Sequence, residues 1–196
     1  RQLVSEKSDQ RTALGRTSKQ ANCLLAIGNT WRSESDNEQA LKLYSEAAAL
    51  YSANDDHYGV GMVEENSGDL FLDEDPTKAL PYYQRALAHY DTLHSAADKA
   101  YILQRIGLAY AGMKKYDEAE RSYVEGNALA RATGSVELVM EYELSLAELA
   151  VKQGKSDLAL GHYQRHMALK DSLQSAEGQR ELLRLRTVFE TEQAEQ

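Results

Sequence analysis

Three columns of small and aromatic residues recur along this chain of 196 residues at intervals of 39 or 40 residues. The columns are the small residues Gly28, Gly68, Gly107 and Ala147, the alanines Ala40, Ala79, Ala119 and Ala159, and the tyrosines Tyr44, Tyr83, Tyr123 and Tyr163. A period of this length, kept in register by three columns, indicates stacked structural repeats, each unable to bury its apolar face alone.

Within each repeat the spacing is helical. Leu103, Ile106 and Tyr110 share one face of a predicted helix, and Ala119 and Tyr123 share one face of the next. The stretch from 112 to 115 forms the turn between them, and the small residues let the two backbones approach closely. Only two prolines and abundant Ala, Leu, Glu and Gln favour helix throughout. The predicted fold class is therefore all-α.

The columns resemble the tetratricopeptide repeat over about residues 17–171. The clearest copy is carried by Leu103, Ile106, Gly107, Tyr110, Ala119, Tyr123 and Gly126. The period exceeds the roughly 34 residues usual in that family, so we expect longer helices or loops. A HEAT-type repeat has the right period but does not explain the glycine, alanine and tyrosine columns. The resemblance implies an α-α superhelix, a solenoid of four helical hairpins with capping helices at both ends.

We expect the array to occupy residues 1–175, with hairpins at about 17–54, 57–94, 97–133 and 135–173. Residues 1–14 would form a cap or a partial repeat, with a new helix capped at Thr17 or Ser18. Asp36 and Asp75 are predicted helix caps, and Pro76 suits a first helical turn. Pro81 either moves that helix start to about Thr77 or distorts its first turn.

Residues 176–196 lack the repeat columns. Leu182, Leu185 and Phe189 lie on one helical stripe in this segment. It is predicted to be a capping helix or a coiled-coil linker to a further domain, and in the second case it offers a surface for homodimerisation.

Composition excludes several functions. The net charge of −9 disfavours nucleic acid and anionic lipid as partners. No apolar run is long enough for a membrane span, and no signal peptide is evident. The single cysteine, Cys23, cannot form an internal disulfide, and its neighbours Ala21, Leu24 and Leu25 predict a buried structural thiol.

The sequence offers little catalytic chemistry. It contains no Gly-rich phosphate loop, no nucleophile elbow and no CxxC motif. His162 and His166 have a spacing that suits zinc on a helix, but His166 occupies a packing column and we expect both to be structural. The acidic run 73–75 is expected to cap a helix rather than bind calcium. We therefore expect no metal, no cofactor and no enzyme.

The resemblance places ligand binding on the concave face, which the first helix of each hairpin lines. The expected ligand-binding residues on that face are Asn29, Arg32, Glu65, Asn66, Asp69, Tyr101, Arg105, Glu141 and Glu148. The amides of Asn29 and Asn66 can pair with an extended peptide backbone. Asn29, Asn66 and Arg105 match positions that chaperone-binding repeats use to hold a peptide carboxylate. The lysines of those repeats are replaced here by Leu25 and Tyr101, which argues against such a clamp.

A second resemblance concerns the C-terminal part. Residues 162–173 and 182–192 are similar to the end of repeat domains in bacterial membrane sensor proteins. In those proteins a transmembrane segment follows, and then a histidine kinase or DNA-binding output domain. This implies a periplasmic sensor domain for a protein or peptide ligand, with a membrane segment after Gln196. The alternative is a scaffold or adaptor without signalling output, in which case a cytoplasmic location is expected.

Overall fold

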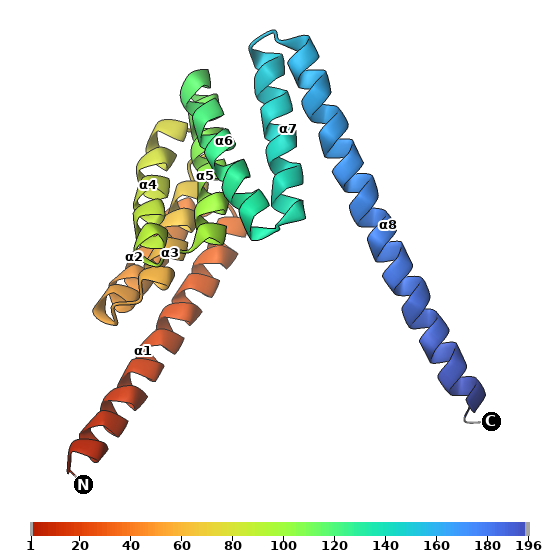
Figure 1. Cartoon of the computed structure of the whole chain (residues 1–196). Helices are drawn as coiled ribbons and strands as arrows, with labels where there is room; N and C mark the ends of the chain where they lie inside the picture. The colour runs from red at the N-terminus through yellow and green to blue at the C-terminus, as the bar shows by residue number, and fades with distance from the viewer. Residues whose placement is uncertain (1, 195–196) are drawn as a thin grey trace. The chain divides into compact units, whose positions relative to one another are not determined.

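The computed structural model describes the backbone of residues 2–194 and the side chains of residue 15 and residues 17–175. The described chain is entirely helical (Figure 1). Its helices are α1 (Gln2–Ser33), α2 (Asn37–Ala53), α3 (His57–Asp69), α4 (Pro76–Thr92), α5 (Ala96–Gly112), α6 (Tyr116–Thr133), α7 (Val136–Lys152) and α8 (Ser156–Ala194). The chain divides into two compact units, Arg1–Leu129 and Ala130–Gln196, and each is described by itself.

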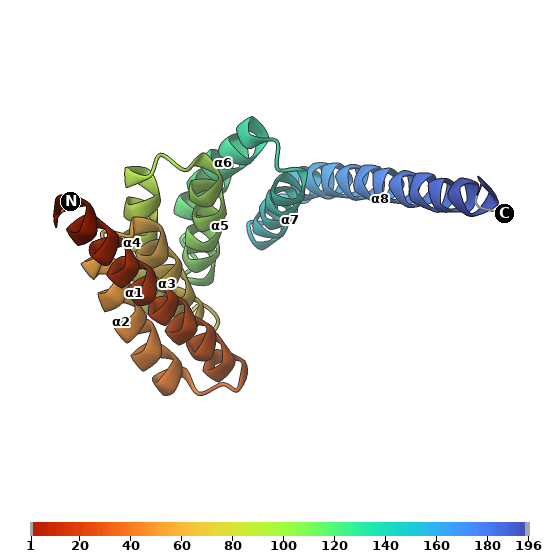
Figure 2. The same ribbon diagram turned by 90° about the horizontal axis from the view of Figure 1, so that it is seen from below.

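The all-α prediction is confirmed, and so are the hairpins. Within the first unit α1 packs on α2 and α3 on α4, while α2 and α4 also contact the first helix of the following hairpin. Figure 2 shows α1, α2 and α3 lying side by side. In the second unit α7 packs on α8. The predicted boundary at 175/176 falls inside α8, and the Leu182, Leu185 and Phe189 stripe lies outside the described side chains.

The same turn closes most helices. Residues with positive φ follow α1, α2, α4, α5, α6 and α7, and they are Ser35, Asp55, His94, Lys114, Gly134 and Gly154. In each case the next backbone N–H donates to a carbonyl five residues earlier, as Lys115 does to Tyr110 at 2.9 Å. This is the Schellman arrangement, which satisfies carbonyls at a helix end. Glycine supplies the left-handed residue at two of the six turns.

The helix starts confirm the predicted caps. Asp36 accepts from the N–H of Gln39 at 3.0 Å, and Asp75 accepts from that of Thr77 at 3.2 Å. Pro76 is the first residue of α4, and Pro81 is accommodated inside that helix on its exposed side. The predicted cap at Thr17 or Ser18 is wrong, because α1 runs unbroken from Gln2 through both residues.

The repeat columns form the helix crossings of the first unit. A Cβ added at Gly28 would lie 2.6 Å from the ring of Tyr44, and one at Gly68 would lie 2.6 Å from that of Tyr83. The Tyr123 ring crowds Gly107 in the same way. Each glycine therefore makes room for a buried tyrosine ring on the second helix of its hairpin. Because the three glycines occupy matching crossings, the prediction of stacked repeats is confirmed for three hairpins.

The second unit breaks this rule. Ala147 stands where the other repeats have glycine, and it is fully buried. Tyr163, the matching tyrosine, is 37% exposed rather than buried. The alignment of Tyr163 with the other tyrosines holds in sequence but not in packing.

Cys23 also departs from expectation, since its side chain is exposed. Ala21 and Leu25, four residues apart, lie buried in the core that α1 shares with α2. Cys23 lies two residues from each of them and so faces away from that stripe.

Candidate functional site

Seven of the nine predicted binding residues lie in the first unit, on helices α1, α3 and α5. They are Asn29, Arg32, Glu65, Asn66, Asp69, Tyr101 and Arg105. All seven are partly buried, and hydrogen bonds or ion pairs engage every one of them. We call this surface the α1–α3–α5 face.

Asp69 joins three helices of this face. Its Oδ2 accepts a hydrogen bond from Arg32 Nη1 at 3.1 Å, and its Oδ1 accepts one from the Tyr83 hydroxyl at 2.7 Å. Arg105 Nε lies 3.8 Å from the same Oδ1. Arg32 Nη1 also donates to Asn66 Oδ1 at 3.2 Å, and the Asn66 amide donates to the Met62 carbonyl at 2.8 Å. We call this set the Asp69 network.

The network remains accessible to solvent. The Asp69 side chain is 19% exposed, that of Arg105 is 27% exposed and that of Arg32 is 36% exposed. Two arginines therefore share one carboxylate, and both reach solvent. Because both arginines and the carboxylate reach solvent, replacing one partner with a ligand group costs less here than in a fully buried ion pair.

Arg105 is also positioned by an aromatic ring. Its Nη2 donates to the Tyr101 hydroxyl at 2.6 Å, and its guanidinium lies 5.2 Å from the centre of the Tyr101 ring. Burial lowers the pKa of Arg105, but the carboxylate of Asp69 and the hydrogen bond to Tyr101 outweigh this and raise it overall. Arg105 Nε is buried and makes no hydrogen bond among the described residues.

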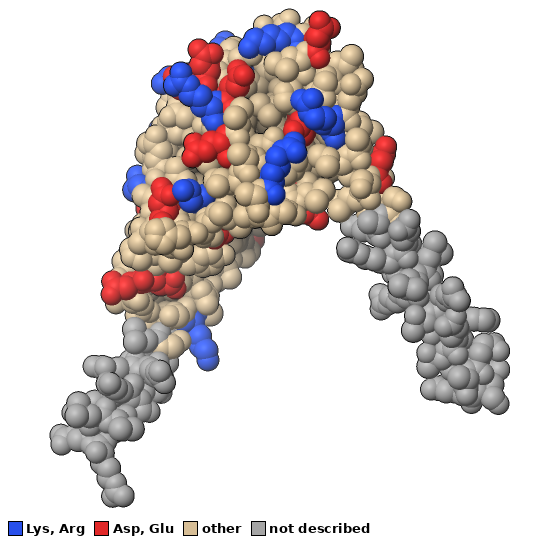
Figure 3. Space-filling model, in the orientation of Figure 1, with Lys and Arg blue, Asp and Glu red and all other residues tan. Residues whose placement is uncertain are grey.

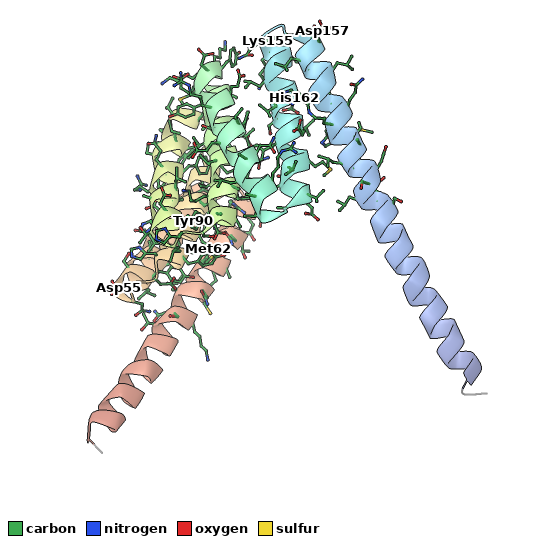
Figure 4. The ribbon with its side chains drawn as sticks, viewed as in Figure 1. Asp55, Met62, Tyr90, Lys155, Asp157 and His162 are labelled. Atoms are coloured by element: carbon green, nitrogen blue, oxygen red, sulfur yellow. The ribbon has the colours of Figure 1, made fainter. Side chains whose placement is uncertain are left out.

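Buried tyrosines support this face from beneath. Tyr44 donates to Asn29 Oδ1 at 2.6 Å, Tyr51 to Asn22 Oδ1 at 2.5 Å and Tyr90 to Glu65 Oε2 at 3.2 Å. Figure 4 labels Tyr90 on α4 close to Met62 on α3. Each ring lies against a glycine, which lets its hydroxyl reach a polar side chain on the first helix of a hairpin. The core tyrosines thus fix the rotamers of the polar side chains on the face.

The carboxyl group of Glu65 has a pKa well above its ordinary value. Burial raises its pKa to about 7, the nearby charge of Asp69 raises it as well, and the Tyr90 hydrogen bond lowers it. Near neutral pH this carboxyl therefore exchanges between a neutral donor and a charged acceptor.

The remaining two predicted residues, Glu141 and Glu148, lie in the second unit, exposed on α7. Between them Glu143 is almost completely buried, with a side chain 3% exposed. Arg131 Nη2, Arg165 Nε and His162 Nδ1 each lie 2.8 Å from its carboxylate oxygens. We call this set the Glu143 cluster. Figure 4 shows His162 between α7 and α8.

His166 is the other half of the pair with zinc-compatible spacing. Its Nδ1 lies 2.9 Å from the Met140 carbonyl. Both histidines of the pair thus bind α7, which agrees with the structural role expected for them.

A groove of about 480 Å³ lies elsewhere in the first unit, and no predicted binding residue lines it. Leu41, Val63 and Tyr82 contribute apolar surface to it, and Lys42 and Glu64 contribute charges. The face of the molecule seen in Figure 3 carries basic and acidic side chains interspersed rather than one large patch of either sign.

The sequence did not indicate the central part played by Asp69 or the buried Glu143. A sequence pattern that could have indicated the role of Asp69 is visible once the structure is known. Asn29 and Asp69 each follow directly after a column glycine, and each accepts from the column tyrosine of its own hairpin. A polar residue directly after such a glycine is placed to meet the hydroxyl.

Comparisons with known proteins agree with the fold. Residues 144–177 match the tetratricopeptide repeat family. This stretch lies in the second unit, where the columns are least regular. No curated protein matches the chain in sequence. Among the described helices, none combines the length and the apolar composition of a membrane span.

Solved structures share the helical architecture at low sequence identity. BtubC from P. vanneervenii has a TM-score of 0.71 at 16% identity, over 88% of this chain and 75% of that one. MamA from Desulfovibrio magneticus RS-1 has a TM-score of 0.61 at 18% identity, over 87% of this chain and 93% of that one. A Rap protein complexed with competence and sporulation factor has a TM-score of 0.69 at 20% identity, over 78% of this chain. The matched region spans 43% of the Rap chain. At these identities the likeness shows the fold, which is that of tetratricopeptide-like helical hairpins.

Proposed function

We propose that the first unit binds a protein or peptide segment along the α1–α3–α5 face. The observation that carries this proposal is the Asp69 network, in which two solvent-accessible arginines share a single partly exposed carboxylate. A peptide carbonyl or carboxylate can accept from either arginine without leaving a buried charge unpaired.

The asparagines contribute to the same surface. The amide oxygen of Asn29 already accepts a hydrogen bond from the Tyr44 hydroxyl. Asn29 would therefore use its amide nitrogen to donate to a peptide carbonyl. Asn66 is held through both its oxygen and its nitrogen, so it positions Arg32 rather than receiving ligand directly. This narrows the expected ligand contacts to Asn29, Arg32 and Arg105.

The fold supports an interaction module. Stacked helical hairpins present an extended surface made from successive first helices, and a Rap protein of similar fold is solved in complex with competence and sporulation factor. We further propose that this chain is the sensory or interaction module of a bacterial signalling protein. That part of the proposal rests on the resemblance of residues 162–173 and 182–192 to membrane sensor proteins. A scaffold without signalling output is the competing function.

Selection from a displayed library of random peptides, followed by affinity measurement, tests the binding proposal. Arg32→Ala combined with Arg105→Gln is expected to weaken a selected peptide at least about tenfold, which is about 1.4 kcal/mol. The matched control is Lys42→Ala combined with Tyr82→Ala, which alters the separate groove. If the control pair weakens binding and the arginine pair leaves it unchanged, the ligand occupies the groove and the proposal is wrong.

The signalling part has its own test. The sequence of the complete gene is expected to encode a membrane-spanning segment after Gln196, followed by a kinase or DNA-binding domain. A complete gene product without either would favour the scaffold.

A further inference from the structure

Two histidines that are distant in sequence meet in the second hairpin. His57 is the first residue of α3, and His89 lies in the last turn of α4. Their Nδ1 atoms are 3.0 Å apart, and their ring centres are 5.2 Å apart at an interplanar angle of 40°. One ring donates and the other accepts, so at least one imidazole is neutral in this arrangement.

The distance between the two Nδ1 atoms is close to the distance between the nitrogens of two imidazoles that bind one metal ion. Two Zn–N bonds of about 2.0–2.1 Å at a tetrahedral angle place the nitrogens roughly 3.3–3.4 Å apart. Bonds of similar length at a right angle, as in tetragonal Cu²⁺ or Ni²⁺ sites, place them about 2.9 Å apart. The observed distance lies between these values. Rotation of the rings, with transfer of the shared proton from Nδ1 to Nε2 of the donor ring, lets both Nδ1 atoms bind one ion.

We propose that His57 and His89 together bind one divalent transition-metal ion, with Cu²⁺ held more tightly than Ni²⁺ or Zn²⁺. Neutral imidazole suits these three metals and not the hard cations Mg²⁺ and Ca²⁺, and affinity for a given site rises towards Cu²⁺ along the first-row series. The described part of the chain contains no group of three or more metal-ligating side chains. Water or a side chain of a bound partner therefore fills the remaining coordination positions.

The scaffold holds the pair in place without the metal. The ring of Tyr90, next to His89 in sequence, packs against Gly61, four residues after His57. Asp56 caps α3 immediately before His57 by accepting from the N–H of Gly59 at 2.9 Å. Both backbones are fixed by these contacts, so metal binding orders only two side chains and costs little conformational entropy.

Metal binding requires both ligating nitrogens to be free of protons. The nearby carboxylate of Glu64 is already paired with Arg85, whose Nη2 lies 2.8 Å from it. The two histidines do not belong to the Asp69 network, so this inference can be tested independently of peptide binding.

The experiment is titration of Cu²⁺, Ni²⁺ and Zn²⁺ into the whole chain in a non-chelating buffer, followed by calorimetry and chemical denaturation. All variants carry Cys23→Ser, because the exposed thiol would otherwise bind or reduce copper. At a free metal concentration ten times the Kd, the ratio of folded to unfolded protein is expected to rise about elevenfold. His57→Ala and His89→Ala are each expected to abolish this rise.

Two matched controls separate this pair from the other histidines. His166→Asn disrupts the closely spaced 162/166 pair, and His94→Asn removes the histidine just after α4 while tolerating its positive φ. Both variants are expected to retain one equivalent of metal and the full stabilisation. Circular dichroism of His57→Gln, which keeps a polar side chain at the helix start, checks that loss of binding is not loss of fold.

Two results would overturn the inference. One is a chain carrying Cys23→Ser alone that millimolar Cu²⁺, Ni²⁺ and Zn²⁺ all fail to stabilise. The other is stabilisation that survives in both His57→Ala and His89→Ala, or that Mg²⁺ reproduces.

Discussion

The Asp69 network and the Glu143 cluster are both built from one carboxylate and several cationic side chains, but they differ in solvent access. Asp69 is partly exposed and shares two arginines that also reach solvent. Glu143 is almost wholly buried, and Arg131, Arg165 and His162 surround it. The arginines of both sets reach solvent, with side-chain exposures of 56% for Arg131 and 51% for Arg165, so the difference lies in the carboxylates. Asp69 can give up an arginine to a ligand without becoming a buried unpaired charge. The carboxylate of Glu143 is enclosed by its partners.

Burial decides which of the two can serve binding. A buried ion pair is costly to break, because removing one partner leaves the other without water or counter-charge. A partly exposed pair is worth little to stability, because water replaces the lost partner. The Glu143 cluster is therefore expected to join α7 to α8 and to the end of α6. The Asp69 network is expected to contribute less to stability and more to binding.

The largest expected effect is that of Glu143→Ala. Removing this carboxylate removes three charge-assisted hydrogen bonds, and water replaces it only in part because just Arg131 and Arg165 reach solvent. The free energy of unfolding should fall by about 3–4 kcal/mol. Urea denaturation measures the change. Glu148→Ala, an exposed glutamate on the same helix, is the matched control and is expected to change stability by less than about 0.5 kcal/mol. Equal losses in the two variants would show that the cluster adds nothing to stability.

The next effect is a pH dependence that belongs to Glu65. Its pKa is raised in the folded state, so the folded state holds a proton that the unfolded state has already released. The stabilisation is complete below the ordinary carboxyl pKa and is lost as pH rises through about 7. It amounts to about 3 kcal/mol at most.

Denaturation of the wild type and of Glu65→Gln from pH 4 to pH 8 measures this contribution. The free energy of unfolding of the wild type relative to that of Glu65→Gln should fall as pH rises across that range. The control Glu148→Gln should leave the pH dependence of the wild-type stability unchanged. A wild type whose stability relative to Glu65→Gln rises with pH would contradict the assignment.

The smallest effect concerns the link between core and face. Tyr83→Phe keeps the buried ring but removes the hydroxyl that donates to Asp69. The expected cost is about 1 kcal/mol, with weaker binding of any peptide that contacts Arg32, because Asp69 loses one of the groups that orient it. Tyr163→Phe removes a hydroxyl from the exposed tyrosine of the same column and should leave both quantities unchanged. A peptide affinity unaffected by Tyr83→Phe would show that the core does not orient the network.

Much of the fold followed from residue spacing alone. The glycine, alanine and tyrosine columns predicted helix crossings, and the glycine–tyrosine pairs of three hairpins confirm them. The caps at Asp36 and Asp75 were predictable because capping depends on a few adjacent residues. The exposure of Cys23 was not predictable, because it depends on which face of α1 packs against α2. The exposure of Tyr163 was not predictable either, because the burial of a column tyrosine depends on how α7 and α8 pack, which residue spacing does not specify.

The candidate site divides in the same way. Its residues were expected on the first helix of each hairpin because of the resemblance to the tetratricopeptide repeat. Their partners could not be predicted, since Arg32 and Asp69 are 37 residues apart and meet only in the folded chain. His57 and His89 are likewise 32 residues apart in sequence and meet only through the packing of α3 on α4.

The sequence by itself determined an all-helical chain of repeated hairpins, because helical period, capping and the need for small residues at crossings are local properties. Only the tertiary structure decided which charges are buried, which tyrosine hydroxyl reaches which carboxyl group and which histidines form a pair. Those outcomes depend on how the helices pack against one another, which no local pattern of residues specifies.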